Sequence, residues 1–157
     1  MKRAWTVGLA VAILVGRAAL AAAPASPVRP VRVESVTLRI LHRVFPDFRE
    51  EDKVRLKEEF RVGDTDYTAK VVEFVPDFSL DLKSRKVVSR SNDPRNPAVR
   101  VVVKEKGVPR DTSWAFLNFP PHFAAKNILA FQILRIDFLD RPPLVAPDSS
   151  ASRGGKP

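Results

Sequence analysis

The chain contains two imidazole side chains, His42 at an expected strand end and His122 directly after a pair of prolines. Ser113 and Asp111 precede His122 closely enough to invite comparison with a serine-type triad. A nucleophile needs a base at about 3 Å and a third group that orients the base, and spacing alone establishes neither. The sequence also lacks a G-x-S-x-G turn. We therefore predict no catalytic residue.

The other groups that could do chemistry are carboxylates. Asp64 and Asp66 form a D-x-D, but the residues after it lack the glycine and the terminal glutamate of an EF-hand loop, so we expect a plain turn. The absence of cysteine, together with only two widely separated histidines, argues against structural zinc. We therefore predict no metal and no cofactor. If the protein is an enzyme, the carboxylates that could lie in its cleft are Asp77, Asp81 and Asp93.

The first residues have the pattern of a secretory signal peptide, which we place at residues 1–25. Met1–Arg3 is a basic head, Ala4–Val15 is almost wholly apolar, and Ala18–Ala25 is a run of small residues. Arg17 and the shortness of the apolar run argue against a membrane anchor, which needs about 20 apolar residues. We expect an exported chain with no membrane span after processing.

Two cleavage positions fit the small-residue rule, after Ala21 and after Ala25. A cut after Ala23 would place Pro24 directly behind the scissile bond, where its ring obstructs the peptidase. Without cysteine there is neither a disulfide nor a lipid-attachment site, so the exported domain depends on its core for stability. These features favour the periplasm of a Gram-negative cell.

The net charge is basic but mixed in sign. Removing the leader takes away Lys2, Arg3 and Arg17 and no acid, which lowers the formal charge from +9 to +6. The basic residues are scattered among acids and form no long run, as on an ordinary solvated surface. Electrostatic attachment to the anionic envelope surface is one alternative, whereas the aromatic residues are not interleaved with the basic ones as in a nucleic-acid-binding module.

Proline content divides the rest of the chain. Residues 26–32 are expected to form an extended tether, residues 33–140 one folded domain, and residues 141–157 a disordered tail rich in Pro, Ser and Gly. About 108 residues suffice for a single hydrophobic core.

Within that domain the dominant period is two. Val99, Val101 and Val103 alternate with Arg100, Val102 and Lys104. Turn signals such as Gly107 and Pro120-Pro121 separate the runs. We predict an all-β fold, a single antiparallel β-sandwich or small barrel with disordered termini. Residues 50–60 fit either a short helix or a strand, and we favour a strand from about Lys53.

On the closing strand, residues 128–138, alternation would place Gln132, Leu134, Ile136 and Phe138 on one face. The predicted core comprises Leu38, Ile40, Val72, Phe74, Val101, Val103, Trp114, Phe116, Leu134 and Ile136.

Pro-Asp-Phe occurs twice, at 46–48 and 76–78. A proline that stops pairing, an aspartate that caps the turn and a phenylalanine that packs back explain the phrase without a duplication.

Between Val71 and Phe123 the order of motifs is similar to periplasmic segments of ResB-type cytochrome c biogenesis proteins. The motifs are the Pro-Asp-Phe strand end at 76–78, Asn-Pro-Ala at 96–98, Trp-x-Phe at 114–116 and Phe119-Pro120. The resemblance implies a periplasmic β-domain of the same build. ResB-type proteins carry membrane helices that are not evident here, so a role with haem is not implied.

A crowded apolar turn is the strongest candidate for a binding site. Phe119, Pro120, Pro121, His122 and Phe123 are consecutive, and Lys126 follows. A loop cannot easily bury so many apolar groups, so we predict a docking patch for a protein or complex of the envelope. The sequence thus favours a non-catalytic binding or assembly accessory, with an enzyme or redox accessory on an envelope substrate as the alternative.

Overall fold

The computed structural model describes residues 30–123 and 126–147, and these residues form strands without any helix. The all-β prediction is confirmed. The strands are β1 (Val33–His42), β2 (Arg49–Val54), β3 (Glu59–Arg61), β4 (Tyr67–Val75), β5 (Phe78–Leu80), β6 (Val87–Ser89), β7 (Ala98–Glu105), β8 (Val108–Phe116), β9 (Leu129–Phe138) and β10 (Leu144–Val145). The predicted leader, at residues 1–25, lies outside the described residues.

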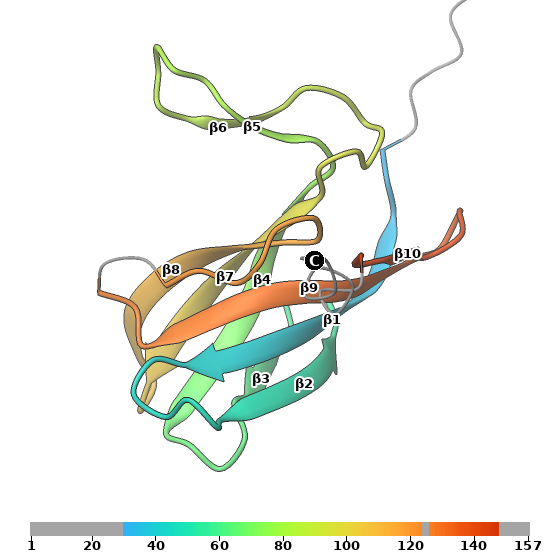
Figure 1. The fold of residues 1–157 in the computed structure, drawn as a ribbon. Coiled ribbons are helices and arrows are strands. Elements are labelled where there is room, and N and C mark those ends of the chain that lie inside the picture. The colour runs from blue at the N-terminus through green and yellow to red at the C-terminus, as the bar shows by residue number, and fades with distance from the viewer. Residues whose placement is uncertain (1–29, 124–125, 148–157) are drawn as a thin grey trace, which may run out of the picture.

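The strands form two four-stranded antiparallel sheets and one separate hairpin (Figure 1). The first sheet has the order β10-β9-β1-β2, and the second has the order β3-β4-β7-β8. Four pairs join neighbours in sequence, β1–β2, β3–β4, β7–β8 and β9–β10. In addition, β9 returns to β1, and β4 pairs with β7 across the inserted hairpin β5–β6. The result is an up-and-down meander whose last long strand closes on its first.

The hydrophobic core fills the space between the two sheets. Valines alternate inward along β7, at Val99, Val101 and Val103, as the sequence predicts. They face β1 and β9, where the largest fully buried side chain is Phe131. The buried core residues are Val36, Leu38, Ile40, Val54, Val62, Ala69, Val71, Val99, Val101, Val103, Ala115, Leu117, Leu129, Phe131, Ile133, Ile136 and Phe138.

A β-bulge in β9 reverses part of the predicted core. Thr37 pairs with Arg135 and the next residue, Leu38, pairs with Ile133, so Leu134 is an extra residue in the ladder. Phe131 and Ile133 therefore point inward, contrary to the alternation predicted for this strand, while Leu134 is only half-buried.

A second bulge has the same effect in β4. Val71 pairs with Val101, whereas Glu73 pairs with Arg100, which leaves Val72 without a place in the register. Val72 is half-buried and outside the core cluster, so its prediction as a core residue is wrong, while Phe74 beyond the bulge packs against the core.

Trp114 and Phe116 are also outside the central core. On β8 the buried residues are Ser113 and Ala115, and the two aromatic residues alternate with them on the opposite face. The prediction that the two aromatic rings share one face holds, but that face is the outer one.

Two further boundaries differ from expectation. The strand expected from Lys53 is two strands, β2 and β3, separated by a turn in which Lys57 has a left-handed φ of 67°. At the C-terminal end β10 adds an edge to the first sheet, with Leu144 opposite Ile136. The folded domain thus extends beyond residue 140 into the segment predicted to be disordered.

Candidate functional site: an aromatic hollow beside the β5–β6 arm

Aromatic rings gather on the outer face of the second sheet. The Phe78 ring contacts Trp114 and Phe116 edge-to-face, with centroids 5.1 Å and 4.9 Å apart. Phe119 packs edge-on against Phe116 at 5.8 Å, and the His122 ring stacks on Phe116 at the same centroid distance. Such geometries are favoured by the ring quadrupoles. The cluster forms a second, smaller apolar nucleus outside the core.

Beside this cluster is a hollow of about 580 Å³ that opens to solvent. Most of its surface is apolar, and the exposed fraction of Phe119 is 53%. Three polar side chains also border it, those of Ser79, Asn96 and His122. The complete lining is Phe78, Ser79, Leu80, Asn96, Phe116, Phe119, Pro120 and His122.

One wall of the hollow belongs to the hairpin β5–β6, which we call the arm (residues 77–91). The arm projects from one end of the sandwich, away from both sheets (Figure 1). Leu80 pairs with Val87, and Phe78 pairs with Ser89. The position of the arm therefore determines the shape of the hollow.

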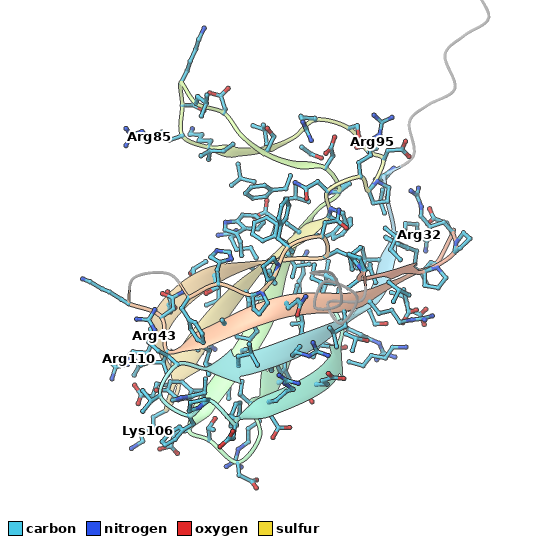
Figure 2. All side chains as sticks on the ribbon, viewed as in Figure 1. Arg32, Arg43, Arg85, Arg95, Lys106 and Arg110 are labelled. Atoms are coloured by element: carbon cyan, nitrogen blue, oxygen red, sulfur yellow. The ribbon has the colours of Figure 1, made fainter. Side chains whose placement is uncertain are left out.

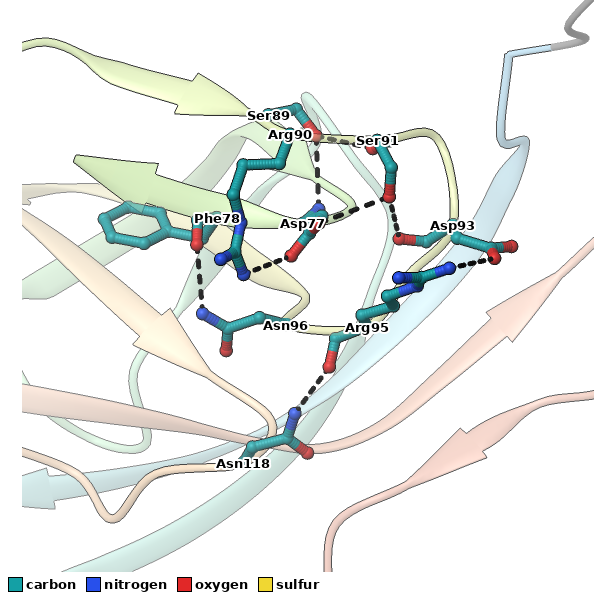
Figure 3. A network of polar contacts seen from close by, with 9 residues as sticks. All are labelled: Asp77, Phe78, Ser89, Arg90, Ser91, Asp93, Arg95, Asn96 and Asn118. Atoms are coloured by element: carbon teal, nitrogen blue, oxygen red, sulfur yellow. Dashed lines mark hydrogen bonds and ion pairs between the residues drawn. The ribbon is translucent and has the colours of Figure 1, made fainter. Parts of the chain in front are cut away.

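A buried carboxylate holds the root of the arm (Figure 3). The side chain of Asp77 is only 5% exposed; it accepts hydrogen bonds from Arg90 Nη2 at 2.9 Å and from Ser91 Oγ at 3.2 Å. The Asp77 backbone N–H donates to Ser89 Oγ, and the Arg90 backbone N–H donates to the Asp77 carbonyl. The two strands of the arm are thus bonded together where they leave the sandwich.

Asn96 connects this root to the hollow. Its side-chain Nδ2 donates to the Phe78 backbone carbonyl at 3.1 Å, and the backbone carbonyl of Asn96 accepts from the Phe78 N–H at 2.9 Å. Asn96 Oδ1 is buried and has no hydrogen-bond partner among the described residues. The side chain of Asn118 donates a hydrogen bond to the Arg95 backbone carbonyl, which connects the loop after β8 to the same root (Figure 3).

The structure divides the predicted docking turn. Phe119, Pro120 and His122 line the hollow, and Pro121 between them is half-buried. The Phe123 ring, 37% exposed, lies under the Arg43 guanidinium at 5.3 Å. Lys126 lines a different cavity of about 410 Å³.

That second cavity is bordered by strands β4, β7, β8 and β9 and is more polar. Tyr67 lines it together with Glu105 and Arg110, which form an ion pair at 2.7 Å. Burial raises the pKa of the Tyr67 phenol, and the Glu105 carboxylate raises it further.

The sequence named Asp77, Asp81 and Asp93 only as candidate carboxylates of an enzyme cleft, and neither the arm as an element nor the role of Asn96 was predicted. The segment 79–91 has the appearance of a Lys-rich linker, because each arm strand is only three residues long and shows no readable alternation. In the sequence Asn96 is only the first residue of the Asn-Pro-Ala motif, because nothing in one sequence indicates that it forms hydrogen bonds with Phe78.

Ser113 and His122 do not form a triad. Ser113 is buried on the inner face of β8 and accepts a hydrogen bond from Asn127, whereas His122 stacks on the outer face. His42 Nδ1 accepts hydrogen bonds from the Val44 and Phe45 N–H groups. Both histidines and the serine are thus engaged in structural contacts.

Among the described residues three carboxyl groups have a lowered pKa, and none of them lines either cavity. Hydrogen bonds from Lys104 and Thr68 lower the pKa of Glu59. Backbone N–H groups of Ser84 and Lys83 lower that of Asp81, and hydrogen bonds from Lys53 and Arg135 lower that of Asp137. The described residues contain no group of three side chains suited to hold a metal ion.

No family model, curated protein or solved structure matches this chain. Over residues 30–123 and 126–147 no helix has the length and apolarity needed to cross a membrane.

Proposed function

We propose that this chain is a non-catalytic, exported β-domain that binds an envelope protein as a binding or assembly accessory, with the aromatic hollow as its docking surface. The observation that carries the proposal is the half-exposed Phe119 on a wall of packed rings. Monomeric proteins rarely leave such apolar surface open without a use for it. The resemblance to periplasmic segments of ResB-type proteins makes a complex of cytochrome c biogenesis one class of partner to look for, without implying that this chain handles haem.

The chemistry around the hollow supports binding over catalysis. An enzyme cleft typically brings together titratable groups whose pKa values are perturbed. Here the lining contains one titratable side chain, His122, and its ring is packed against Phe116. The carboxyl groups with shifted pKa values are held by ion pairs or backbone N–H groups elsewhere.

The hollow fits an apolar side chain of a partner protein. Pro120-Pro121 restricts the backbone of the loop, and the Asp77 hydrogen bonds hold the arm, so little ordering is required on binding. A ring or branched aliphatic group from the partner would contact Phe119 and Leu80. The polar groups of Ser79 and His122 at the border would orient the partner's backbone.

The chain provides a matched pair of variants to test this. Phe119→Ser removes a ring that lines the hollow, and Phe123→Ser removes an exposed ring outside it. The bait is the tagged protein purified from the envelope fraction, and mass spectrometry identifies both its partners and its N-terminus. We expect an N-terminus at Ala22 or Ser26, and a partner that Phe119→Ser loses while Phe123→Ser retains it.

Circular dichroism and thermal unfolding of both variants show whether each is folded. A folded Phe119→Ser protein that recovers every partner of the unmodified protein would refute the hollow as the docking surface. Retention of Met1 in the bait would refute export with removal of the leader.

A further inference from the structure

The tip of the arm, residues 81–86, carries exposed cations around an exposed leucine. Leu82 has 86% of its surface exposed, the largest value among the exposed large apolar side chains described. Lys83, Arg85 and Lys86 follow it and are all exposed. No ion pair involves these three cations in the part of the chain that the structure describes.

The loop geometry keeps these side chains pointing outward. Asp81 Oδ1 accepts the backbone N–H groups of Lys83 and Ser84 at 2.9 Å and 2.8 Å. The Arg85 N–H donates to the Asp81 carbonyl, and Arg85 has a left-handed φ of 55°. Because backbone donors occupy the Asp81 carboxylate, the one acidic residue of the tip does not pair with the cations beside it.

The position of the tip lets it reach a flat surface. The arm extends beyond the two sheets (Figure 1), and Arg85 on the arm lies at the opposite end of the molecule from Lys106 (Figure 2). Among the residues that the structure describes, the arm is separate from the strands of the two sheets, which leaves its tip open to a planar partner (Figure 1). Leu80 and Val88, which are 48% and 42% exposed, extend the apolar character along the arm.

We propose that the arm tip binds the surface of an anionic phospholipid bilayer, with Leu82 entering the interface and Lys83, Arg85 and Lys86 contacting the headgroups. Cations near an anionic leaflet and apolar side chains at the acyl boundary are the two contributions that hold peripheral proteins on membranes. A single leucine on a convex tip fits a fluid interface that closes around it, whereas an acidic protein segment would need a concave surface to meet it.

The test uses vesicles of phosphatidylglycerol and phosphatidylcholine and the protein as isolated from cells, measured by cosedimentation at low salt. Each basic residue at an anionic surface contributes about 1 kcal/mol, so replacing Lys83, Arg85 and Lys86 by Gln should weaken binding roughly 100-fold. Leu82→Ser should weaken it roughly tenfold. Every variant carries the same termini, so the differences report on the arm.

The matched control replaces by Gln three exposed cations of the body that, like those of the tip, form no ion pair among the described residues: Arg49, Lys57 and Arg61. This control should bind like the unmodified protein, and added salt should weaken binding of both far more than binding of the arm variant. In addition, Leu82→Trp should show a blue shift of emission with the anionic vesicles.

Equal losses in the arm and body variants would overturn the proposal, because they would show a response to net charge alone. Equal binding to pure phosphatidylcholine vesicles, or binding to an acidic peptide and not to vesicles, would also overturn it. The outcome is independent of the aromatic hollow, since Phe119→Ser leaves the tip intact.

Discussion

Removal of the Asp77 carboxylate should open the root of the arm, where its two strands are bonded together, without unfolding the sandwich. Asp77→Ala deletes the acceptor of the hydrogen bonds from Arg90 and Ser91. The Arg90 side chain is 61% exposed, so after the substitution its guanidinium is hydrated and no buried charge is left unpaired.

The magnitude follows from these two bonds. A hydrogen bond to a charged group contributes about 1.5–3 kcal/mol, and the one from Arg90 is weakened by its exposure to water. We take about 2 kcal/mol for the pair, which corresponds to a roughly 30-fold increase in the opening of the arm. Asp77→Asn retains one acceptor oxygen and should lose about half of this free energy.

Hydrogen exchange measures the opening directly. The Phe78 and Arg90 amides, bonded to the Asn96 and Asp77 carbonyls, report on the root of the arm. The Arg43 amide, bonded to the Ile128 carbonyl, reports on the sandwich. In Asp77→Ala the two arm amides should exchange roughly 30-fold faster, and the Arg43 amide should keep its rate.

Two results would refute this reasoning. Unchanged exchange of Phe78 and Arg90 would mean that the carboxylate contributes nothing to closure of the arm. Equal acceleration of all three amides would mean that the arm and the sandwich open as one cooperative unit.

Two further predictions concern the packing of the core and the loss of stability at low pH. Phe131→Ala should lower the free energy of unfolding, measured by urea denaturation, by about 3–5 kcal/mol because the ring is fully buried. Trp114→Ala should lower it by only about 2 kcal/mol because that ring is half-buried. Equal losses would show that Trp114 belongs to the core. The lowered pKa of Asp137 means that the folded state binds fewer protons than the unfolded state in acid, so its contribution is present above the usual carboxyl pKa and is lost as the pH falls through the lowered value. In Asp137→Asn the urea concentration at the unfolding midpoint should therefore fall less steeply as the pH is lowered below about pH 4. An unchanged fall would show that other groups cause it.

Period-two patterning was enough to predict the fold class but not the facing of every strand. Val99, Val101 and Val103 alternate without interruption and are all buried, as predicted. Val72 and Leu134 are also aliphatic residues, but each is the extra residue of a β-bulge, and the sequence pattern does not indicate where a bulge occurs. Beyond a bulge the faces exchange, because one added residue is half of the strand's period.

The candidate site was predictable only in part. The crowded loop at Phe119 and Pro120 was identified because its apolar residues are consecutive, and those residues line the hollow. The opposite wall, Phe78 and Leu80, comes from an arm whose strands are too short to show a period. Its position depends on the buried Asp77, and from sequence this residue is indistinguishable from the exposed Asp47 in the other Pro-Asp-Phe phrase.

The pairing of β9 with β1 has a consequence for how the chain folds. Ser35 donates a hydrogen bond to Asp137, a residue 102 positions later, and the first sheet is incomplete until β9 arrives. Contacts between such distant positions slow folding because the long loop must close before any contact is gained. A chain emerging from a ribosome thus cannot complete its first sheet before β9 has emerged, and until then β1 has the unpaired edge that a chaperone would recognise.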